Sequence, residues 1–112
     1  MDETKVSAAI EFLGARKSFG KDGSPRAQYW YVFRVGEKLD VNVFVHFGAI
    51  GTLDGKRLSE DECKLAARTL IEMEIENHRD LSDVGEGLDV DKGAMFHITH
   101  RLGWRGRFYK SV

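Results

Sequence analysis

The sequence predicts a two-layer α+β domain, and three patterns lead to that prediction. Two runs rich in β-branched and aromatic residues, at 29–35 and 41–47, are separated by a short polar connection. Alternating apolar residues precede them, and a longer segment with helical spacing of its apolar residues follows. Strands followed by a helix, rather than strands alternating with helices, are typical of α+β folds. We therefore expect a three-stranded antiparallel meander, then one amphipathic helix, then a C-terminal β segment.

The chain is expected to form a single domain over residues 1–112. A content of 42% hydrophobic and 31% charged residues is that of an ordinary globular protein. No apolar run approaches the roughly 20 residues that span a bilayer. The acidic N-terminus lacks the basic and apolar regions of a signal peptide. Cys63 is the single cysteine, which fits a reducing compartment. These features predict a cytoplasmic protein with no membrane partner.

Residues 5–17 are expected to form the first strand, because their side chains alternate as on a half-buried strand. A helix is the alternative, since residues such as Ala8 and Ala9 are good helix formers. We favour the strand because Gly14 would weaken a helix. The segment that follows, FGKDGSP at 19–25, is also a strong turn cluster.

The runs at 29–35 and 41–47 are expected to pair as the central hairpin. In the second run alternate positions are uniformly apolar, which predicts a core face made of Val41, Val43, Val45 and Phe47. The first run is apolar on both faces, which is typical of a strand covered on both sides. We expect a helix over one sheet face. A long loop, a chain terminus or a second molecule would cover the other face, and the last of these implies a homodimer formed through the sheet.

The best-defined boundary in the sequence is the start of a helix at Ser59. Ser59 and Glu62 have the spacing of a capping box, and Leu58 with Cys63 can form a hydrophobic staple beside it. The helix is expected to continue to about residues 78–80. Its predicted buried stripe consists of Cys63, Ala66, Ala67, Leu70 and Met73, widened by Leu65, Ile71 and Ile75. Such a helix would cover one face of the sheet.

The segments after this helix give weaker signals. Residues 80–93 are acidic and contain glycines, and we expect an ordered but mobile loop there, with a helical turn as the alternative. Residues 94–102 fit either a strand or a helix. Their aromatic and β-branched side chains favour a strand, which is the prediction made here. As a helix they would instead place Met95, Ile98 and Leu102 on one stripe.

Charge is strongly segregated along the chain, although the net charge is only −1. Residues 59–91 carry eleven acidic and three basic side chains, and residues 92–112 carry five basic side chains and no acidic one. The favoured interpretation is that the two segments pair with each other. The alternative is that the helix presents an acidic face to a basic partner protein. The residues assigned to that face are Glu72, Glu74 and Glu76.

The C-terminal segment also predicts a nucleic-acid interface, because its cations are interleaved with aromatic residues. Cations neutralise phosphates while aromatic rings stack on unpaired bases, so the pattern fits single-stranded nucleic acid. The residues assigned to this interface are Arg101, Trp104, Arg105, Arg107 and Tyr109. The sequence pI of about 6.4 argues against it, because domains that grip nucleic acid are usually basic.

Catalytic and metal-binding motifs are incomplete. The loop Gly51–Arg57 lies between a predicted strand and a predicted helix, but it has one residue too few between its glycines for a phosphate-binding loop. His97 and His100 are candidates for a catalytic base beside an aspartate of residues 80–91. They could share a metal only on a helix. We predict neither a cofactor nor a metal site.

Taken together, these patterns predict a small non-enzymatic regulatory module that binds a macromolecular partner, with a protein as the first expectation. Single-stranded nucleic-acid binding through the C-terminal segment is the first alternative. A small enzyme that uses His97 or His100 is the second. None of the motifs identifies a protein family.

Overall fold

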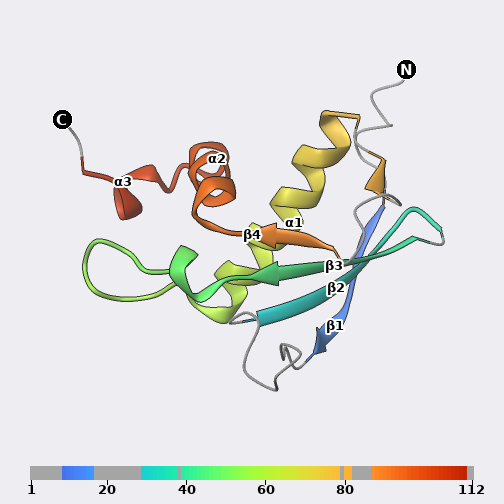
Figure 1. Cartoon of the computed structure of the whole chain (residues 1–112), viewed down its shortest axis with the longest axis horizontal. Coiled ribbons are helices and arrows are strands. Elements are labelled where there is room, and N and C mark those ends of the chain that lie inside the picture. Colours follow the sequence, from blue (N-terminus) through green and yellow to red (C-terminus); the bar gives the residue numbers. More distant parts are fainter. Residues whose placement is uncertain (1–8, 17–28, 38, 79, 82–86, 111–112) are drawn as a thin grey trace.

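The computed structural model describes the chain in five stretches, residues 9–16, 29–37, 39–78, 80–81 and 87–110. It confirms the predicted α+β class: a four-stranded sheet packs against helices (Figure 1). The predicted turn cluster at 19–25 and the first residues of the predicted strand at 5–17 lie outside the described residues.

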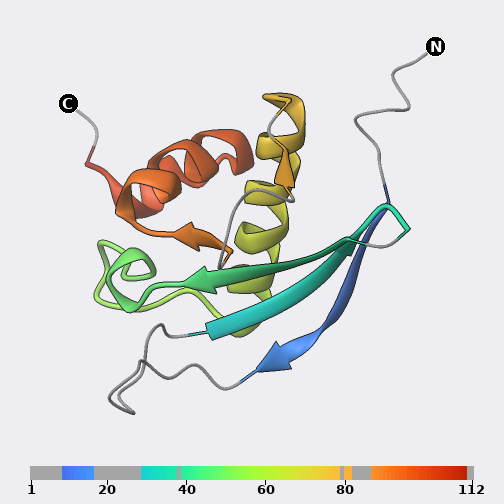
Figure 2. The same cartoon turned by 45° about the vertical axis from the view of Figure 1, so that its right-hand side comes forward.

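Three antiparallel strands form the predicted meander: β1 (Ile10–Arg16), β2 (Tyr29–Val35) and β3 (Leu39–Val45). Strands β2 and β3 pair along their whole length, and Figure 2 shows them as two long twisted arrows that lie side by side. The pairing of β1 with β2 shifts between Phe12 and Gly14. Such a bulge bends the strand and disturbs the regular row of backbone groups at the sheet edge. The first strand and the central hairpin are thus confirmed.

A fourth strand, β4 (Leu88–Val90), corrects the predicted loop at 80–93. It pairs in parallel with the end of β3. Gly87 allows the approach, because its φ is 135° and a Cβ atom there would lie 2.4 Å from the carbonyl oxygen of Asn42. A strand of three residues is too short to show a period-2 pattern, and its partner is remote in the sequence. The sequence therefore contains no local signal for it.

Helix α1 (Glu60–Glu76) begins at the predicted capping box. The Ser59 hydroxyl accepts a hydrogen bond from the Glu62 backbone N–H at 3.2 Å, and the Glu62 carboxylate accepts one from the Ser59 N–H at 2.9 Å. Helix α1 packs against β2, β3 and β4, and it ends slightly earlier than predicted. The predicted cover for one sheet face is confirmed.

The hydrophobic core lies between α1 and the sheet. Its almost fully buried members from these elements are Tyr31, Phe33, Val41, Val43, Val45, Cys63, Ala66, Ala67, Leu70 and Ile71. Two residues predicted to be in the core are not buried, since Phe47 is 59% exposed and Leu65 is 43% exposed. Phe47 leaves the core because β3 ends at Val45 and the chain turns into a short 3-10 helix, η2 (Phe47–Ala49).

The C-terminal segment is helical, so the predicted strand at 94–102 is wrong. Helix α2 (Lys92–Leu102) is followed by a single turn, α3 (Arg105–Phe108). Asp91 caps α2 by accepting a hydrogen bond from the Ala94 N–H at 2.9 Å. Gly103 ends the helix in the left-handed conformation, with a φ of 75°.

The helical alternative wins at 94–102 because of its apolar stripe. Met95 and Ile98 are 1% and 0% exposed, and α2 packs against α1, β4 and η2. In proteins, most of the stability of a helix comes from packing an amphipathic face, which outweighs weak intrinsic preferences of individual residues. The aromatic and β-branched residues that suggested a strand are therefore accommodated in a helix.

The sheet face away from α1 is covered at its centre. The Trp30 indole N–H donates a hydrogen bond to the Asn42 side-chain oxygen at 3.0 Å, and the Trp30 and Phe44 rings lie 5.4 Å apart between centroids. Val32 and Phe44 are only 7% and 4% exposed. Within a single chain this face therefore already buries its central apolar residues, and a homodimer through it stays a prediction.

Candidate functional site

The favoured interpretation of the charge segregation, pairing within the chain, is confirmed for two of the C-terminal arginines. Arg101 binds Glu76 through two hydrogen bonds, and Arg107 binds Glu62 through two more, at 2.8 and 3.3 Å. Both pairs join the C-terminal helices to α1. The guanidinium of Arg107, together with the Ser59 N–H, holds the pKa of the Glu62 carboxyl below its usual value.

The three glutamates assigned to an acidic partner-binding face are not equivalent. Glu72 pairs with Arg68 on the preceding turn of α1, and Glu76 pairs with Arg101. Glu74 is two residues from each of them, and two residues on an α-helix correspond to about 200° of rotation. Glu74 therefore points to a different side of α1 from Glu72 and Glu76.

The five residues assigned to a nucleic-acid interface are also divided. Arg101 and Arg107 are held in the ion pairs with α1. Trp104 is half-buried, with the Arg107 guanidinium 5.3 Å from the centre of its ring. Arg105 and Tyr109 remain exposed. Among the residues that the structure describes, no carboxylate lies within ion-pair distance of Arg105.

The exposed aromatic rings near η2 and α3 have guanidinium groups over their faces. Arg105 lies 4.6 Å from the centre of the Phe96 ring and 5.9 Å from that of Tyr109. Arg57 lies 5.0 Å from the centre of the Phe47 ring. These are cation–π distances. We call these five residues the cation–aromatic surface: Phe47, Arg57, Phe96, Arg105 and Tyr109.

Three members of this surface were missed by sequence reasoning. Phe47 was predicted to lie in the core, Arg57 was assigned to no binding site, and Phe96 was predicted to lie on a strand. The rings of Phe47, Phe96 and Tyr109 are 59%, 41% and 36% exposed. Large apolar side chains left exposed together often mark a binding surface. The helical alternative for 94–102 was the signal that could have found Phe96. In that helix, Phe96 lies about one turn after Lys92, the first residue of α2.

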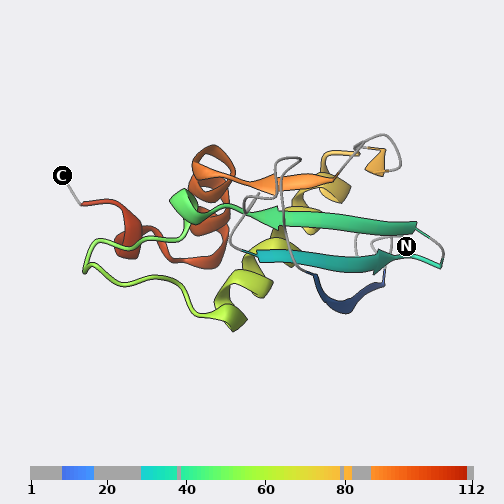
Figure 3. The ribbon, with the colours of Figure 1, turned by 60° about the horizontal axis from the view of Figure 1, so that its bottom comes forward.

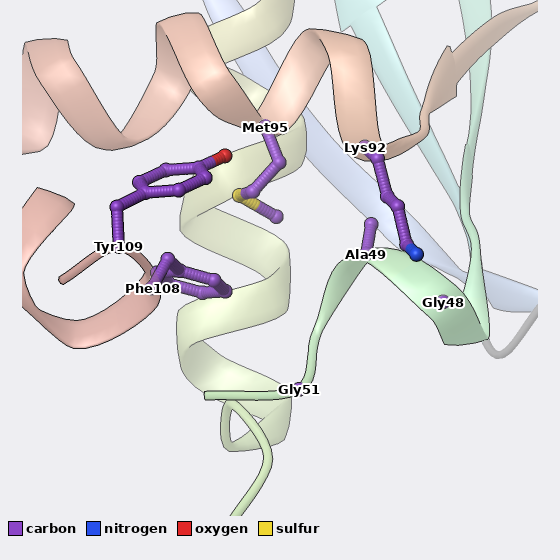
Figure 4. A pocket seen from close by; sticks show the side chains of 7 residues that line it. All are labelled: Gly48, Ala49, Gly51, Lys92, Met95, Phe108 and Tyr109. Carbon is purple, nitrogen blue, oxygen red and sulfur yellow. The ribbon is translucent and has the colours of Figure 1, made fainter. Parts of the chain in front are cut away.

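A cavity of about 260 Å³ adjoins the cation–aromatic surface. Its lining residues are Gly48, Ala49, Gly51, Lys92, Met95, Phe108 and Tyr109. Figure 4 shows Met95, Phe108 and Tyr109 on one side of it, and Ala49 with the Lys92 side chain on the other. The walls therefore combine apolar and aromatic side chains with polar surface, and the Lys92 ammonium group lies at one side.

The parallel pairing of β3 and β4 positions this cavity. The two strands run side by side in the same direction, so η2 and α2 continue from the same edge of the sheet (Figure 3). The His46 N–H donates to the Val90 carbonyl at 3.1 Å, and the His46 ring bonds the Asp89 carboxylate at 2.8 Å. Clefts in sheets with parallel strands commonly lie at such carboxyl ends.

The loop at 51–57 is fixed to the C-terminal turn. Gly51 forms a backbone bridge with Arg57, and the Leu53 N–H donates to the Arg107 carbonyl at 2.8 Å. The loop closes without the Ser or Thr that a phosphate-binding loop needs after its lysine. Its role in the site is therefore to place Gly51 and Arg57 beside the cavity.

The histidines singled out for catalysis are exposed on α2. Within the described residues neither His97 nor His100 has a carboxylate partner, whereas His46 does, in Asp89. The described residues also contain no group of three His, Cys, Asp or Glu side chains that could hold a metal. Cys63 is fully buried, and burial raises the pKa of its thiol to about 12, as expected for an unreactive core cysteine.

Comparisons with protein-family models, curated proteins and solved structures find no match to this chain. Among the helices that the described residues form, none is both long enough and apolar enough to cross a bilayer. A functional assignment therefore rests on the site itself.

Proposed function

We propose that this protein binds single-stranded nucleic acid through the cation–aromatic surface. The observation that carries the proposal is the pairing of exposed aromatic rings with arginines that have no carboxylate partner among the described residues. Arg105 lies over Phe96 and Tyr109, and Arg57 lies over Phe47.

A single strand matches this chemistry on two counts. Its unpaired bases offer flat faces that stack on exposed rings, at about 1–3 kcal/mol per base. Its phosphates can bind the guanidinium groups beside those rings. A duplex hides its base faces, so it would use the cations but not the exposed rings. The net charge of −1 implies that attraction is local to this surface rather than a property of the whole molecule.

The acidic face of α1 supports a protein-binding function less well. Glu72 and Glu76 are already engaged with Arg68 and Arg101, so a basic partner would have to displace contacts within the chain. Exposed ion pairs contribute only about 0–1 kcal/mol, so a basic partner could replace Arg68 or Arg101 at a small energetic cost. The exchange would swap one cation for another, so it would add no net charge attraction. Among the residues that the structure describes, no carboxylate competes in this way for Arg105.

The test is the affinity of the protein for a fluorescent oligothymidine, measured by anisotropy between about 50 and 200 mM salt. Each phosphate neutralised on a single strand contributes roughly −0.7 to the slope of log K against log salt. Replacing Arg57 and Arg105 together by alanine should weaken binding about ten- to a hundredfold and flatten that slope by roughly 1.4.

The matched control is Lys64→Ala, which removes a cation that lies 4.3 Å from the centre of the Phe12 ring on the β1 side of the molecule. This variant should bind the oligothymidine like the original protein. Equal losses in the control and in the double variant would mean that binding is diffuse. Absence of binding by the original protein at the lower salt concentration would overturn the proposal.

A further inference from the structure

We propose that the cavity beside the cation–aromatic surface accepts one unpaired base, with the Lys92 ammonium group on the neighbouring phosphate. This inference rests on the proposed function. It assigns the position at which the protein discriminates between bases of the bound strand. The surface alone would stack any base, whereas a pocket with walls on two sides also selects by size and shape.

The size of the cavity limits what it can hold. Pockets for drug-sized ligands occupy about 300–1,000 Å³, and this one is about 260 Å³. It therefore has room for a single ring system rather than for a larger ligand. Met95, Phe108 and Tyr109 provide apolar and aromatic walls on one side (Figure 4). Such walls favour a flat, weakly polar ring.

The opposite side of the cavity is open because glycines form it. A Cβ atom built on Gly51 would meet no other atom within 4 Å. One built on Gly48 would lie 3.7 Å from the Lys92 side chain. The backbone is therefore exposed to a ligand at these two positions, and backbone groups can bond the edge of a base.

Lys92 supplies the charge for a phosphate. Its ammonium group has no carboxylate partner among the residues that the structure describes. The neighbouring Asp91 accepts the N–H of Ala94, which engages one of its oxygens at the start of α2. A lysine acts as a point charge toward phosphate, so this contact adds affinity without fixing the base.

The cavity is continuous with the stacking rings. Tyr109 belongs to both the cavity and the cation–aromatic surface. On the other side Gly48 directly follows Phe47, and Gly51 is bridged to Arg57. A strand that stacks on the Phe47 and Phe96 rings would thus pass the cavity mouth, where one base can enter.

The direct test is a titration of the ¹⁵N-labelled protein with adenosine and thymidine monophosphates, followed by amide chemical shifts. We expect saturable shifts at Gly48, Gly51 and Lys92, and different affinities for the two bases. Inorganic phosphate is the control ligand and should move Lys92 without saturating the glycine amides at the same concentration. Shifts that are the same with phosphate and with both nucleotides would overturn base recognition.

Two variants separate this inference from the proposed function. Gly51→Val adds a branched side chain to the cavity lining and should abolish the difference between homopolymer oligonucleotides, while Gly106→Ala adds a methyl group at a residue that does not line this cavity and should not. Lys92→Met should reduce the salt slope by roughly 0.7. Thermal melting checks that each variant is folded. If Gly51→Val does not fold, Lys92→Met is the variant that tests the cavity.

The outcomes are distinct. Oligonucleotide binding that needs Arg57 and Arg105 but ignores both cavity variants would overturn only the cavity assignment. Nucleotide shifts at the cavity without any oligonucleotide binding would overturn strand binding and leave a mononucleotide site.

Discussion

Arg105 and Arg107 lie two residues apart on α3, and the structure uses them differently. Arg107 reaches Glu62 at the start of α1 and forms a two-bonded ion pair. Arg105 lies over the rings of Phe96 and Tyr109. The difference comes from what lies within reach and not from residue type. Arg107, whose charge is paired with Glu62, joins two elements of the fold. Arg105, which lies over aromatic rings, remains available to an anionic ligand.

The same contrast runs along α2. Arg101 in its last turn binds Glu76, whereas Lys92 at its first position lines the cavity. The basic C-terminal segment is therefore two groups of side chains with different roles. Arg101 and Arg107 join the C-terminal helices to α1, and Lys92 with Arg105 faces the candidate site.

The largest expected effect comes from disturbing the parallel pairing of β3 with β4, because β4 leads into α2, which carries both Arg101 and Lys92. Gly87→Ala would force a Cβ atom against the Asn42 carbonyl at a φ of 135°. We expect a loss of more than about 2 kcal/mol in the free energy of unfolding, because β4 must move away from β3. Oligonucleotide affinity should fall as well, since β4 leads into α2. Urea unfolding monitored by circular dichroism measures the first effect.

The control for this variant is Gly36→Ala. Gly36 also has a positive φ, of 70°, but a Cβ atom there would meet nothing within 4 Å. Its cost should therefore be conformational strain alone, at about 1–2 kcal/mol. If both variants lose the same stability, the close approach of Gly87 to Asn42 is not what constrains β4.

The contrast itself is sharpened by comparing Arg105→Ala with Arg107→Ala. Loss of Arg105 should weaken oligothymidine binding about tenfold, because it removes one phosphate contact and one stacking partner, and it should cost no more stability than its cation–π contacts supply, at most about 1 kcal/mol. Loss of Arg107 should change affinity less than about twofold while lowering stability. Anisotropy titrations and urea unfolding on the same two proteins give both quantities. Equal affinity losses would show that the Glu62 ion pair opens when the strand binds.

The sequence was sufficient where local chemistry decides the structure. The capping box at Ser59 and Glu62 is complete within four residues, and the hairpin of β2 and β3 follows from alternation and a glycine turn. Both could be predicted because their partners are close in the chain. The burial of most of the α1 stripe followed from the same helical periodicity, but Met73 and Ile75 are only partly buried and Leu65 is exposed.

The candidate site could not be assembled in this way. Its parts come from η2, the 51–57 loop, α2 and α3, and they meet only because β4 pairs in parallel with β3. That pairing depends on three residues and on the absence of a side chain at Gly87. The cap at Asp91 and the left-handed Gly103 were available as signals for α2. They were outweighed by strand preferences that packing later overrode.

The smallest expected effect concerns pH and the ion pair of Arg107 with Glu62. Because this pair lowers the pKa of Glu62 in the folded protein, it contributes stability above the unfolded pKa of about 4.3. That contribution is lost as the pH falls from this value through the lower folded pKa. Both side chains are about one-third exposed or more, at 41% and 32%, so the contribution should be below about 1 kcal/mol.

The measurement is the difference in free energy of unfolding between the original protein and Arg107→Ala, taken near pH 7 and again near pH 3. The difference should be present near neutrality and shrink in acid, because a protonated Glu62 no longer attracts the guanidinium. Arg105→Ala provides the comparison and should show no such pH dependence, since Arg105 has no carboxylate partner among the described residues. A difference for Arg107→Ala that persists near pH 3 would mean that its contact with the Trp104 ring, rather than its charge pair, stabilises the fold.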